Sequence, residues 1–431
     1  MNSRETAFSI LQRIDREELF AHPLLERVEG DVRDRNFVRS MVLGVLRWRL
    51  QLDYLIAHLA SRAIGRIDEK VAQILRIGIY QQMHMNVPAH AAVSESVELA
   101  RRMTPRAKSF TNAILRAAAR VNLQSLIPAG EDSESLSIRF SHPLWMVNSW
   151  RSVYGDQRTR AILAANQELS FGDLIVNTTR CSVSDASQEL CRLSIDHEVS
   201  TLVPGVIRLK ASSSAVHGLV ERGLAYGMDE GSAAIPMLLP SEIDGNVIDM
   251  AAAPGGKTFM LTMQGHSVVS NDLSISRLTH LVASHERLFD AKPRAVASDG
   301  RHPPFRAVPA VLLDAPCSAT GTIRKNPEVK WRLKPQDIET FVQLQTELLR
   351  AALDLSTQYC IYSTCSLQQE ENEGVVASVL RDRHDFEILD PTPSLPEELA
   401  RWIDGRVLHL TPESGTDGFV AHLLRRTSTP K

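Results

Sequence analysis

The chain has 431 residues, of which 43% are hydrophobic and 23% charged, values typical of globular proteins rather than of disordered or fibrous ones. No apolar run approaches the ~20 residues of a membrane span, and the charged start MNSRETAFSILQRIDREELF lacks the apolar core of a signal peptide. We therefore expect a cytoplasmic protein without membrane contact, with two or three domains of roughly 150 residues each. Five cysteines without a CxxC pair or a zinc-like Cys/His cluster argue against a disulfide scaffold and a metal site.

Charge is unevenly distributed along the chain. The net charge is only -3, but residues 1–120 contain 19 Lys and Arg against 13 Asp and Glu, a surplus of +6. The remaining residues contain 29 against 38, a deficit of -9. The N-terminal part is thus the better place to look for a polyanion-binding surface.

The first 120 residues carry apolar side chains at helical spacing. In SFTNAILRAAARV, residues 109–121, they recur every third or fourth position and form one face. QILRIGIYQQMHM and AAVSESVELARRM follow the same pattern. This predicts an all-α bundle with arginines on its outer faces, where the simplest interpretation of such charges is a solvated surface.

A change of composition follows the helical part. Residues 122–136 mix Pro, Gly, Ser and acids, as linkers do. HPLWMVNSWRSVYG then predicts an amphipathic helix, and DLIVNTTRCSVSDASQELCRL predicts a strand followed by a helix, with Cys181 and Cys191 in structural roles. We expect an all-α domain at 1–125, a linker and small α+β module at 126–224, and a third domain at 225–431.

Short aliphatic strands alternate with helices from about residue 225. The strands are predicted in NVIDM, SVVSND, AVASD, AVLLD and YCIYST. This alternation is typical of an α/β domain with a mainly parallel, doubly wound sheet, which binds ligands at the carboxyl ends of its strands. Those ends carry an unusual number of polar residues, namely Asp249, Asp272, Asp299, Asp314, Cys317 and Cys365.

The segment APGGKT, residues 253–258, joins the first of these strands to a helix. It matches the end of the phosphate-loop signature, but the first glycine of that signature would be residue 251, which is alanine. A glycine-rich turn before a helix still lets backbone N–H groups approach a ligand closely. Asp272, at the end of the next strand, is placed to accept hydrogen bonds from ribose hydroxyls, and Asp299 to reach an adenine edge. Because GxGxxG is absent, the pattern favours a nucleoside-containing cofactor other than NAD.

Two cysteines follow strands that open on the same edge of the predicted sheet. Cys365 precedes SLQQEENEGVVASVL, which is predicted to be a helix, and a thiol at a helix N-terminus is deprotonated more readily. Cys317 lies in a Pro-Cys-Ser turn soon after Asp314, whereas Cys360 lies inside its strand and is expected to pack. Either strand-end thiol is a plausible nucleophile.

These motifs resemble the Sun/RsmB group of RNA cytosine C5 methyltransferases over nearly the whole chain. The matching segments are DMAAAPGGKT, SNDLSISRL, SDGR, LLDAPCSATGTIRKNPEVKW, IYSTCSLQQEENEGVV and TDGFVAHLLRR. The leading segments VLRWRLQLDYLI and FTNAILRAAARV are similar to a NusB-type RNA-binding domain. The resemblance implies a NusB-like bundle, a small RNA-recognition module and a Rossmann-like class I S-adenosylmethionine methyltransferase domain.

The resemblance also implies an activity and roles for the strand-end residues. It implies methylation of C967 of 16S rRNA by a monomer that acts on free rRNA or an early assembly intermediate. Cys365 would add to C6 of the base, which makes C5 nucleophilic. Asp314 would bind the cytosine edge, and Cys317 would serve product release. Attack by Cys317, as in DNA cytosine methyltransferases, is the mechanistic alternative.

Contacts with S-adenosylmethionine carry over from the family to matching positions. They are Ala251, Ala252, Ala253, Pro254, Gly255, Gly256, Lys257, Asp272, Arg277, Asp299 and Asp314. Arg324, Lys325, Lys330 and Arg332 are candidates to bind RNA phosphates, with a solvated helix start as the alternative. The chain departs from the family at Ala251, where cysteine is usual, and at Met228 and Gly231 in MDEGSAAI.

Two other functions remain open at the level of sequence. The catalytic motifs do not encode the target, so tRNA or large-subunit rRNA is an alternative substrate. A non-catalytic RNA-binding or antitermination factor is the alternative of another class. A degenerate domain of that kind would be expected to lose Cys365, Asp314 or the Gly-Gly turn, and all three are present.

Overall fold

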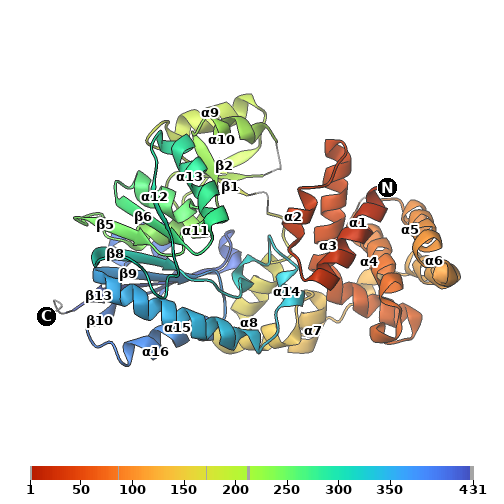
Figure 1. The fold of residues 1–431 in the computed structure, drawn as a ribbon. Helices are drawn as coiled ribbons and strands as arrows, with labels where there is room; N and C mark the ends of the chain where they lie inside the picture. The colour runs from red at the N-terminus through yellow and green to blue at the C-terminus, as the bar shows by residue number, and fades with distance from the viewer. Residues whose placement is uncertain (1, 86, 171, 211–213, 428–431) are drawn as a thin grey trace. The chain divides into compact units, whose positions relative to one another are not determined.

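The computed structural model describes residues 2–85, 87–170, 172–210 and 214–427 (Figure 1). The chain divides into two compact units: unit 1 comprises Met1–Glu168 and Ile323–Lys334, and unit 2 comprises Leu169–Thr322 and Pro335–Lys431. The predicted boundaries after residues 125 and 224 fall inside these units, so the three-domain division stays a prediction. Among the described residues, no helix is both long enough and apolar enough to cross a bilayer.

Unit 1 is the predicted all-α bundle. Its α-helices are α1 (Ser3–Glu17), α2 (Ala21–Leu25), α3 (Val32–Ala60), α4 (Glu69–His84), α5 (Ala89–Met103), α6 (Lys108–Ala118), α7 (Ser133–Arg139), α8 (Leu144–Ala165) and α14 (Val329–Arg332). Side-chain caps begin several of them: Asp31 accepts from the N–H of Asp34, and Asp68 from that of Val71. The α8 backbone is interrupted at Gly155, whose φ of 72° is readily adopted only by glycine.

The segment Ile323–Lys334 belongs to unit 1 although it follows the strand that ends at Asp314. The Trp331 indole Nε1 donates to the carbonyl of Leu46 at 2.6 Å, and the Glu328 carboxylate accepts from the backbone N–H of Ala21 at 2.8 Å. The Lys330 ammonium donates to two buried carbonyl oxygens of unit 1. This segment is therefore part of the internal structure of the bundle.

A small antiparallel sheet opens unit 2 and forms the predicted α+β module. Its strand order is β2-β3-β1-β4, with the bounds β1 (Asp173–Val176), β2 (His197–Val199), β3 (Val206–Leu209) and β4 (Ala225–Gly227). Helices α9 (Val183–Arg192) and α10 (His217–Glu221) accompany it, and apolar side chains of both pack with those of β1 and β3. The small sheet lies in the same unit as the main sheet.

The main sheet has the order β11-β12-β13-β9-β8-β5-β6-β7, and β10 pairs with β13. Its strands are β5 (Asn246–Asp249), β6 (Ser267–Asp272), β7 (Arg294–Ala297), β8 (Val308–Asp314), β9 (Ser356–Thr364), β10 (Phe386–Leu389), β11 (Ile403–Asp404), β12 (Val407–Leu410) and β13 (Phe419–Arg426). The five strands from β9 to β7 pair in parallel, while β13 pairs antiparallel with β9. The predicted mainly parallel sheet is confirmed.

Alternate side chains of β8 point to opposite faces of this sheet, as strand geometry requires. Leu312 belongs to a core with apolar residues of α12 (Gly256–Met263) and α13 (Ile275–Phe289), whereas Leu313 belongs to a core with α15 (Asp337–Leu355) and α16 (Glu373–Leu380). Helices thus cover both faces of the strands, which is the doubly wound arrangement. The short helices α11 (Glu230–Ala234) and α17 (Glu397–Ala400) complete the unit.

Candidate active site

A cavity of about 430 Å³ lies at the carboxyl ends of β5 and β8 in unit 2. Its lining includes the glycine-rich turn that follows β5, the carboxylates of Asp249 and Asp314, and the thiol of Cys365. Met228, Ser232 and Phe419 complete the part of the wall discussed below. This is the edge where open parallel sheets bind their ligands, and the volume lies within the usual range for a small-molecule site.

The turn between β5 and α12 has a backbone conformation that requires Gly255, and it passes close to a side chain at Gly256. Gly255 has φ 117°, and a Cβ there would lie 2.4 Å from the Phe259 ring. A Cβ on Gly256 would lie 2.2 Å from the Met228 sulfur. The backbone therefore passes close to its neighbours, and the first two residues of α12, Gly256 and Lys257, line the cavity.

Two of the residues expected to bind the cofactor hold this turn from outside the cavity. Asp272, at the end of β6, accepts from the N–H of Ala253 at 3.1 Å and from that of Ser274 at 2.9 Å. The Arg277 guanidinium donates to the carbonyl oxygen of Ala253 and lies 3.7 Å from the Asp272 carboxylate. These residues fix the shape of the turn, and ribose binding by Asp272 stays a prediction.

Lys257 forms a buried polar contact inside the cavity wall. Its ammonium donates to the Ser232 hydroxyl and to Asp314 Oδ2, both at 2.7 Å, and lies 5.0 Å from the centre of the Phe419 ring. The other carboxylate oxygen of Asp314 accepts from the Ser363 hydroxyl at 2.8 Å. Asp314 is thereby fixed in orientation by charge-assisted bonds.

Asp249 is an acid whose environment disfavours its charge. Burial raises the pKa of Asp249 to about 7, against the opposing effect of the hydrogen bond from the Thr258 hydroxyl at 2.7 Å. Its Oδ1 is buried and has no hydrogen-bond partner among the described residues. A cationic or hydrogen-bonding ligand in the cavity would satisfy this oxygen, so the donor set fits a positively charged sulfonium cofactor.

The two strand-end cysteines lie in different environments although their sulfurs are only 3.2 Å apart. Cys365, directly after β9, lines the cavity, whereas Cys317 does not. The hydrogen bond with Cys365, followed by burial and the charges of Cys365 and Glu371, raises the pKa of the Cys317 thiol well above its usual range. The geometry thus presents Cys365 to the cavity and keeps Cys317 protonated beside it.

The prediction that Cys365 lies at a helix N-terminus is wrong. The next α-helix, α16, begins only at Glu373. The chain between them bonds to the buried Asn372 side chain, whose amide donates to the carbonyls of Ser366 at 3.0 Å and Gln368 at 2.9 Å. These local side-chain bonds compete with a helical turn.

The buried Glu371 carboxylate holds the turn that carries Cys317. Both of its oxygens accept from the Ser318 N–H, at 3.1 and 2.9 Å, and its carbonyl accepts from the Tyr362 hydroxyl at 2.6 Å. The amide of Gln345 donates to the carbonyl of Pro316 at 2.9 Å on the other side of the cysteine. The Cys317 position is therefore fixed on both sides by buried bonds.

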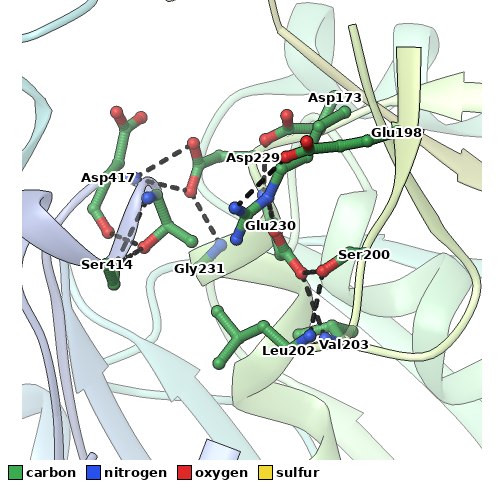
Figure 2. A network of polar contacts seen from close by, with 12 residues as sticks. Asp173, Glu198, Ser200, Leu202, Val203, Asp229, Glu230, Gly231, Ser414 and Asp417 are labelled. Atoms are coloured by element: carbon green, nitrogen blue, oxygen red, sulfur yellow. Dashed lines mark hydrogen bonds and ion pairs between the residues drawn. The ribbon is translucent and has the colours of Figure 1, made fainter. Parts of the chain in front are cut away.

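A second network ties together the segments that carry Ser232 and Phe419, the two residues beside the Lys257 ammonium. Figure 2 shows this network around Asp229, Glu230 and Asp417. The buried Glu230 carboxylate pairs with the Arg208 guanidinium and accepts from the Ser200 hydroxyl and, at 3.0 Å, from the Val203 N–H. Its neighbour Asp229 accepts from the N–H of Gly231 at 2.8 Å and from the N–H of Asp417 at 3.0 Å. The small sheet and the start of β13 are thus tied to the segment that carries Ser232.

Sequence interpretation missed Ser232, Phe419 and Met228 as parts of the cavity wall, and Glu371 and Glu230 as its supports. Ser232 and Met228 lie in MDEGSAAI. This segment departs from the family at Met228 and Gly231, so no site role could be carried over to it. Phe419 lies in TDGF, within a segment that resembles the family but to which no role was assigned from the sequence. Burial of Glu371 and Glu230 follows only from tertiary contacts, so no local signal distinguished them from the surface acids around them.

Asp299 lies outside the cavity lining. The Arg301 guanidinium bonds to its carboxylate at 2.7 Å, and this hydrogen bond is the main cause that lowers the pKa of Asp299 to about 2. Its predicted contact with adenine stays a prediction.

The four expected RNA-binding cations lie in unit 1, and two of them are buried. Lys330 is 1% exposed, its ammonium donates to the carbonyls of Arg47 and Ser141 at 2.7 Å each, and burial lowers its pKa well below the usual range. Arg324 is 6% exposed. The expectation that these two bind phosphates is wrong, because the bundle encloses their side chains. Arg332 stacks 4.1 Å from the Phe20 ring, and Lys325 is partly exposed.

Dinucleotide-binding and S-adenosylmethionine-dependent enzymes share a doubly wound sheet with a glycine-rich turn after one strand and an acid after the next. Without GxGxxG, this chain has the pattern of a class I, S-adenosylmethionine-dependent methyltransferase. Family models match three parts of the chain: the 16S rRNA methyltransferase RsmB/F family at residues 236–425, the NusB family at 1–120 and a RsmF/B-like ferredoxin-like domain at 142–216.

Relatives extend the match over most of the chain. It is 30% identical to a probable ribosomal RNA small subunit methyltransferase B of Synechocystis over 90% of both chains, and 27% identical to one of Bacillus subtilis over 98% of both. The crystal structure of PH0851 has the same fold, with a TM-score of 0.78 and 22% identity over 98% of both chains. The chain belongs to the RsmB/F methyltransferase family and is an RNA methyltransferase that uses S-adenosylmethionine.

Proposed function

We propose that the protein methylates C5 of a cytosine in small-subunit rRNA, with C967 of 16S rRNA as the target, through a covalent adduct between Cys365 and C6 of the base. The observation that carries the proposal is the position of Cys365. Its thiol lines the same cavity as the glycine-rich turn, Lys257 and Asp314. The printed names of the relatives from Synechocystis and Bacillus subtilis support small-subunit rRNA as the substrate.

The proposed reaction begins with attack by the Cys365 thiolate on C6. The new C–S bond moves the electrons of the C5–C6 double bond towards C5 and makes that carbon nucleophilic. S-adenosylmethionine supplies the electrophilic methyl group at this point. Asp314, held in place by Lys257 and Ser363, stabilises the cytosine edge as its charge changes.

Release of the product requires loss of the C5 proton to a base and cleavage of the C6–S bond, which restores the double bond and returns Cys365 as a thiolate. The Cys317 sulfur lies 3.2 Å from the Cys365 sulfur. Because Cys317 retains its proton, it is placed to donate a hydrogen bond to the departing thiolate. We therefore assign attack to Cys365 and release to Cys317. A base within a folded rRNA must be unpaired or flipped to enter this cavity.

The test uses Cys317→Ala and Cys365→Ala variants with S-adenosylmethionine and a small-subunit rRNA transcript. We expect Cys317→Ala to accumulate a denaturation-resistant protein–RNA adduct and Cys365→Ala to form none. Mapping the crosslinked base then identifies the target nucleotide. An adduct in Cys365→Ala alone would reverse the two roles. Absence of adduct and methyl transfer in every protein, the wild type included, would exclude this substrate.

A further inference from the structure

A groove of about 600 Å³ lies between α5 and α6 of unit 1, two helices that run side by side (Figure 1). Its lining includes Val93 and Val97 of α5 and three cations, Lys108, Arg116 and Arg120, which we call its rim. All three cations are exposed. The groove lies far in sequence from the active-site residues, and none of its lining side chains belongs to the cavity of unit 2.

The cations form a regular row along α6. Lys108, Asn112 and Arg116 are four residues apart, so they lie on one side of the helix, and Arg120 continues the spacing beyond its end. The opposite side of α6 buries Ile114 and Ala118 in the core of the bundle. From Lys108 to Arg116 the row extends about 12 Å at 1.5 Å per residue, which is long enough to contact more than one phosphate group.

Many other arginines of the bundle are paired with acids, whereas these three cations are not. Arg13 pairs with Glu17, Arg76 with Asp53, and Arg102 with both Glu5 and Glu98. Among the residues that the structure describes, no carboxylate lies within ion-pair distance of Lys108, Arg116 or Arg120.

The single acid that lines the groove, Glu98, is occupied by Arg101 at 2.6 Å and Arg102 at 3.0 Å. The three cations of the rim therefore present positive charge that no neighbour neutralises. A row of this kind is complementary to an extended polyanion.

We propose that the α5–α6 groove binds the sugar–phosphate backbone of the rRNA substrate. Lys108, Arg116 and Arg120 contact phosphates, and the polar side chains His90, Ser94 and Asn112 are available to ribose hydroxyls. No large aromatic side chain lines the groove, so it binds without reading bases. This inference deepens the proposed function, because it rests on RNA as the substrate. It also replaces the buried Arg324 and Lys330 as a source of phosphate contacts.

The test measures binding of a small-subunit rRNA transcript to the full chain as a function of salt. The Lys108→Gln/Arg116→Gln/Arg120→Gln variant is compared with Arg16→Gln/Arg33→Gln/Arg66→Gln. The control removes the same charge from exposed arginines of unit 1 that do not line the groove. Each lost phosphate contact lowers the slope of log K against log salt by roughly 0.7 to 0.9, so the groove variant should lose about 2. Its affinity should fall on the order of tenfold or more at ~0.1 M salt.

Methyl transfer by the same proteins separates this inference from the proposed function. We expect the groove variant to raise the KM for RNA on the order of tenfold, in line with its affinity, while kcat at saturating RNA stays within about twofold of the wild type. Two results would overturn the groove proposal: the same slope of log K against log salt in the wild type and the groove variant, or the same loss of slope in the control variant. An acidic protein segment would then be the ligand left for the groove. Failure of the wild type to methylate the transcript, with the slope difference intact, would overturn the proposed function alone.

Discussion

The turns that carry Cys317 and Cys365 follow neighbouring parallel strands, but the two cysteines have different surroundings. Cys365 lines the cavity beside Lys257 and Asp314. Cys317 lies behind it in a turn held by the buried Glu371 carboxylate and the Gln345 amide. The two sulfurs are only 3.2 Å apart, but the thiols differ in their access to the cavity and in their buried surroundings. This difference suits the two separate roles that we propose for them.

The largest expected effect comes from removing the accessible thiol. Cys365→Ala should lower methyl transfer about 10⁴-fold or more, because Cys365 carries the one thiol that lines the cavity in the described part of the chain. Cys360→Ala removes a buried cysteine inside β9 that does not line the cavity, and this variant should keep nearly full activity. Turnover with tritiated methyl donor measures both. Substantial activity in Cys365→Ala would assign attack to the other thiol.

The second-largest effect is expected from breaking the ion pair between Lys257 and Asp314 in the cavity wall. Lys257→Met should lower kcat/KM on the order of a hundredfold, because Asp314 loses a charge-assisted bond at 2.7 Å and remains partly buried without its cation. Lys292→Met removes a solvent-exposed lysine of the same unit and should have no effect. Steady-state kinetics with varied methyl donor provide the measurement, and equal values for the two variants would show that the pair does not contribute.

A smaller effect on activity is expected from removing the charge of Glu371, which holds the turn that carries Cys317. Glu371→Gln keeps the shape of the side chain but weakens the charged contact with the Ser318 N–H, a change of about 1.4 kcal/mol or about tenfold. We expect slower turnover together with partial accumulation of the protein–RNA adduct, because release is impaired more than attack. The exposed neighbour Glu370→Gln is the control. A tenfold loss without adduct would mean that Glu371 supports the fold of the site rather than the release step.

The smallest effect is a shift in pH dependence. The hydrogen bond with Cys365 is the largest cause that raises the pKa of Cys317, and Cys365→Ala removes it. Burial and the charge of Glu371 remain and still raise this pKa, so in that background alkylation of Cys317 should stay slow near neutral pH and increase in alkaline solution. Adding Glu371→Gln removes one anion and should move the rise to lower pH by less than about one unit. Mass spectrometry of the peptide that contains Cys317 follows the labelling. A shift to higher pH would contradict the assigned charge effect.

The sequence predicted the architecture well because hydrophobic spacing is a local signal. The helical bundle, the small α+β module and the mainly parallel sheet are all found, and the polar residues at strand ends do include the cavity residues Asp249, Asp314 and Cys365. What it could not predict depends on contacts between distant segments. Ser232 and Lys257 form a hydrogen bond although they are 25 positions apart in the sequence, and Glu371 and Ser318 do so at a separation of 53.

The same limit explains the two incorrect expectations. Lys330 and Arg324 were expected to bind RNA phosphates because they belong to a run of bases after Cys317, and the alternative was a solvated helix start. Tertiary contacts instead enclose both side chains in the bundle. The helix expected after Cys365 starts late because buried side chains, such as that of Asn372, take over the backbone bonds of the intervening segment.

The return of Ile323–Lys334 to unit 1 has a consequence for how the protein is made. The bundle cannot acquire Lys330 and Trp331 until the ribosome has synthesised the roughly 150 residues that follow Glu168. At about 5 to 20 residues per second this interval lasts about 8 to 30 seconds. During that time the nascent bundle lacks the contacts to the carbonyls of Arg47 and Leu46. We expect the bundle to be more sensitive to protease while the chain is nascent than after its release. The bundle is completed only when Ile323–Lys334 docks, late in translation.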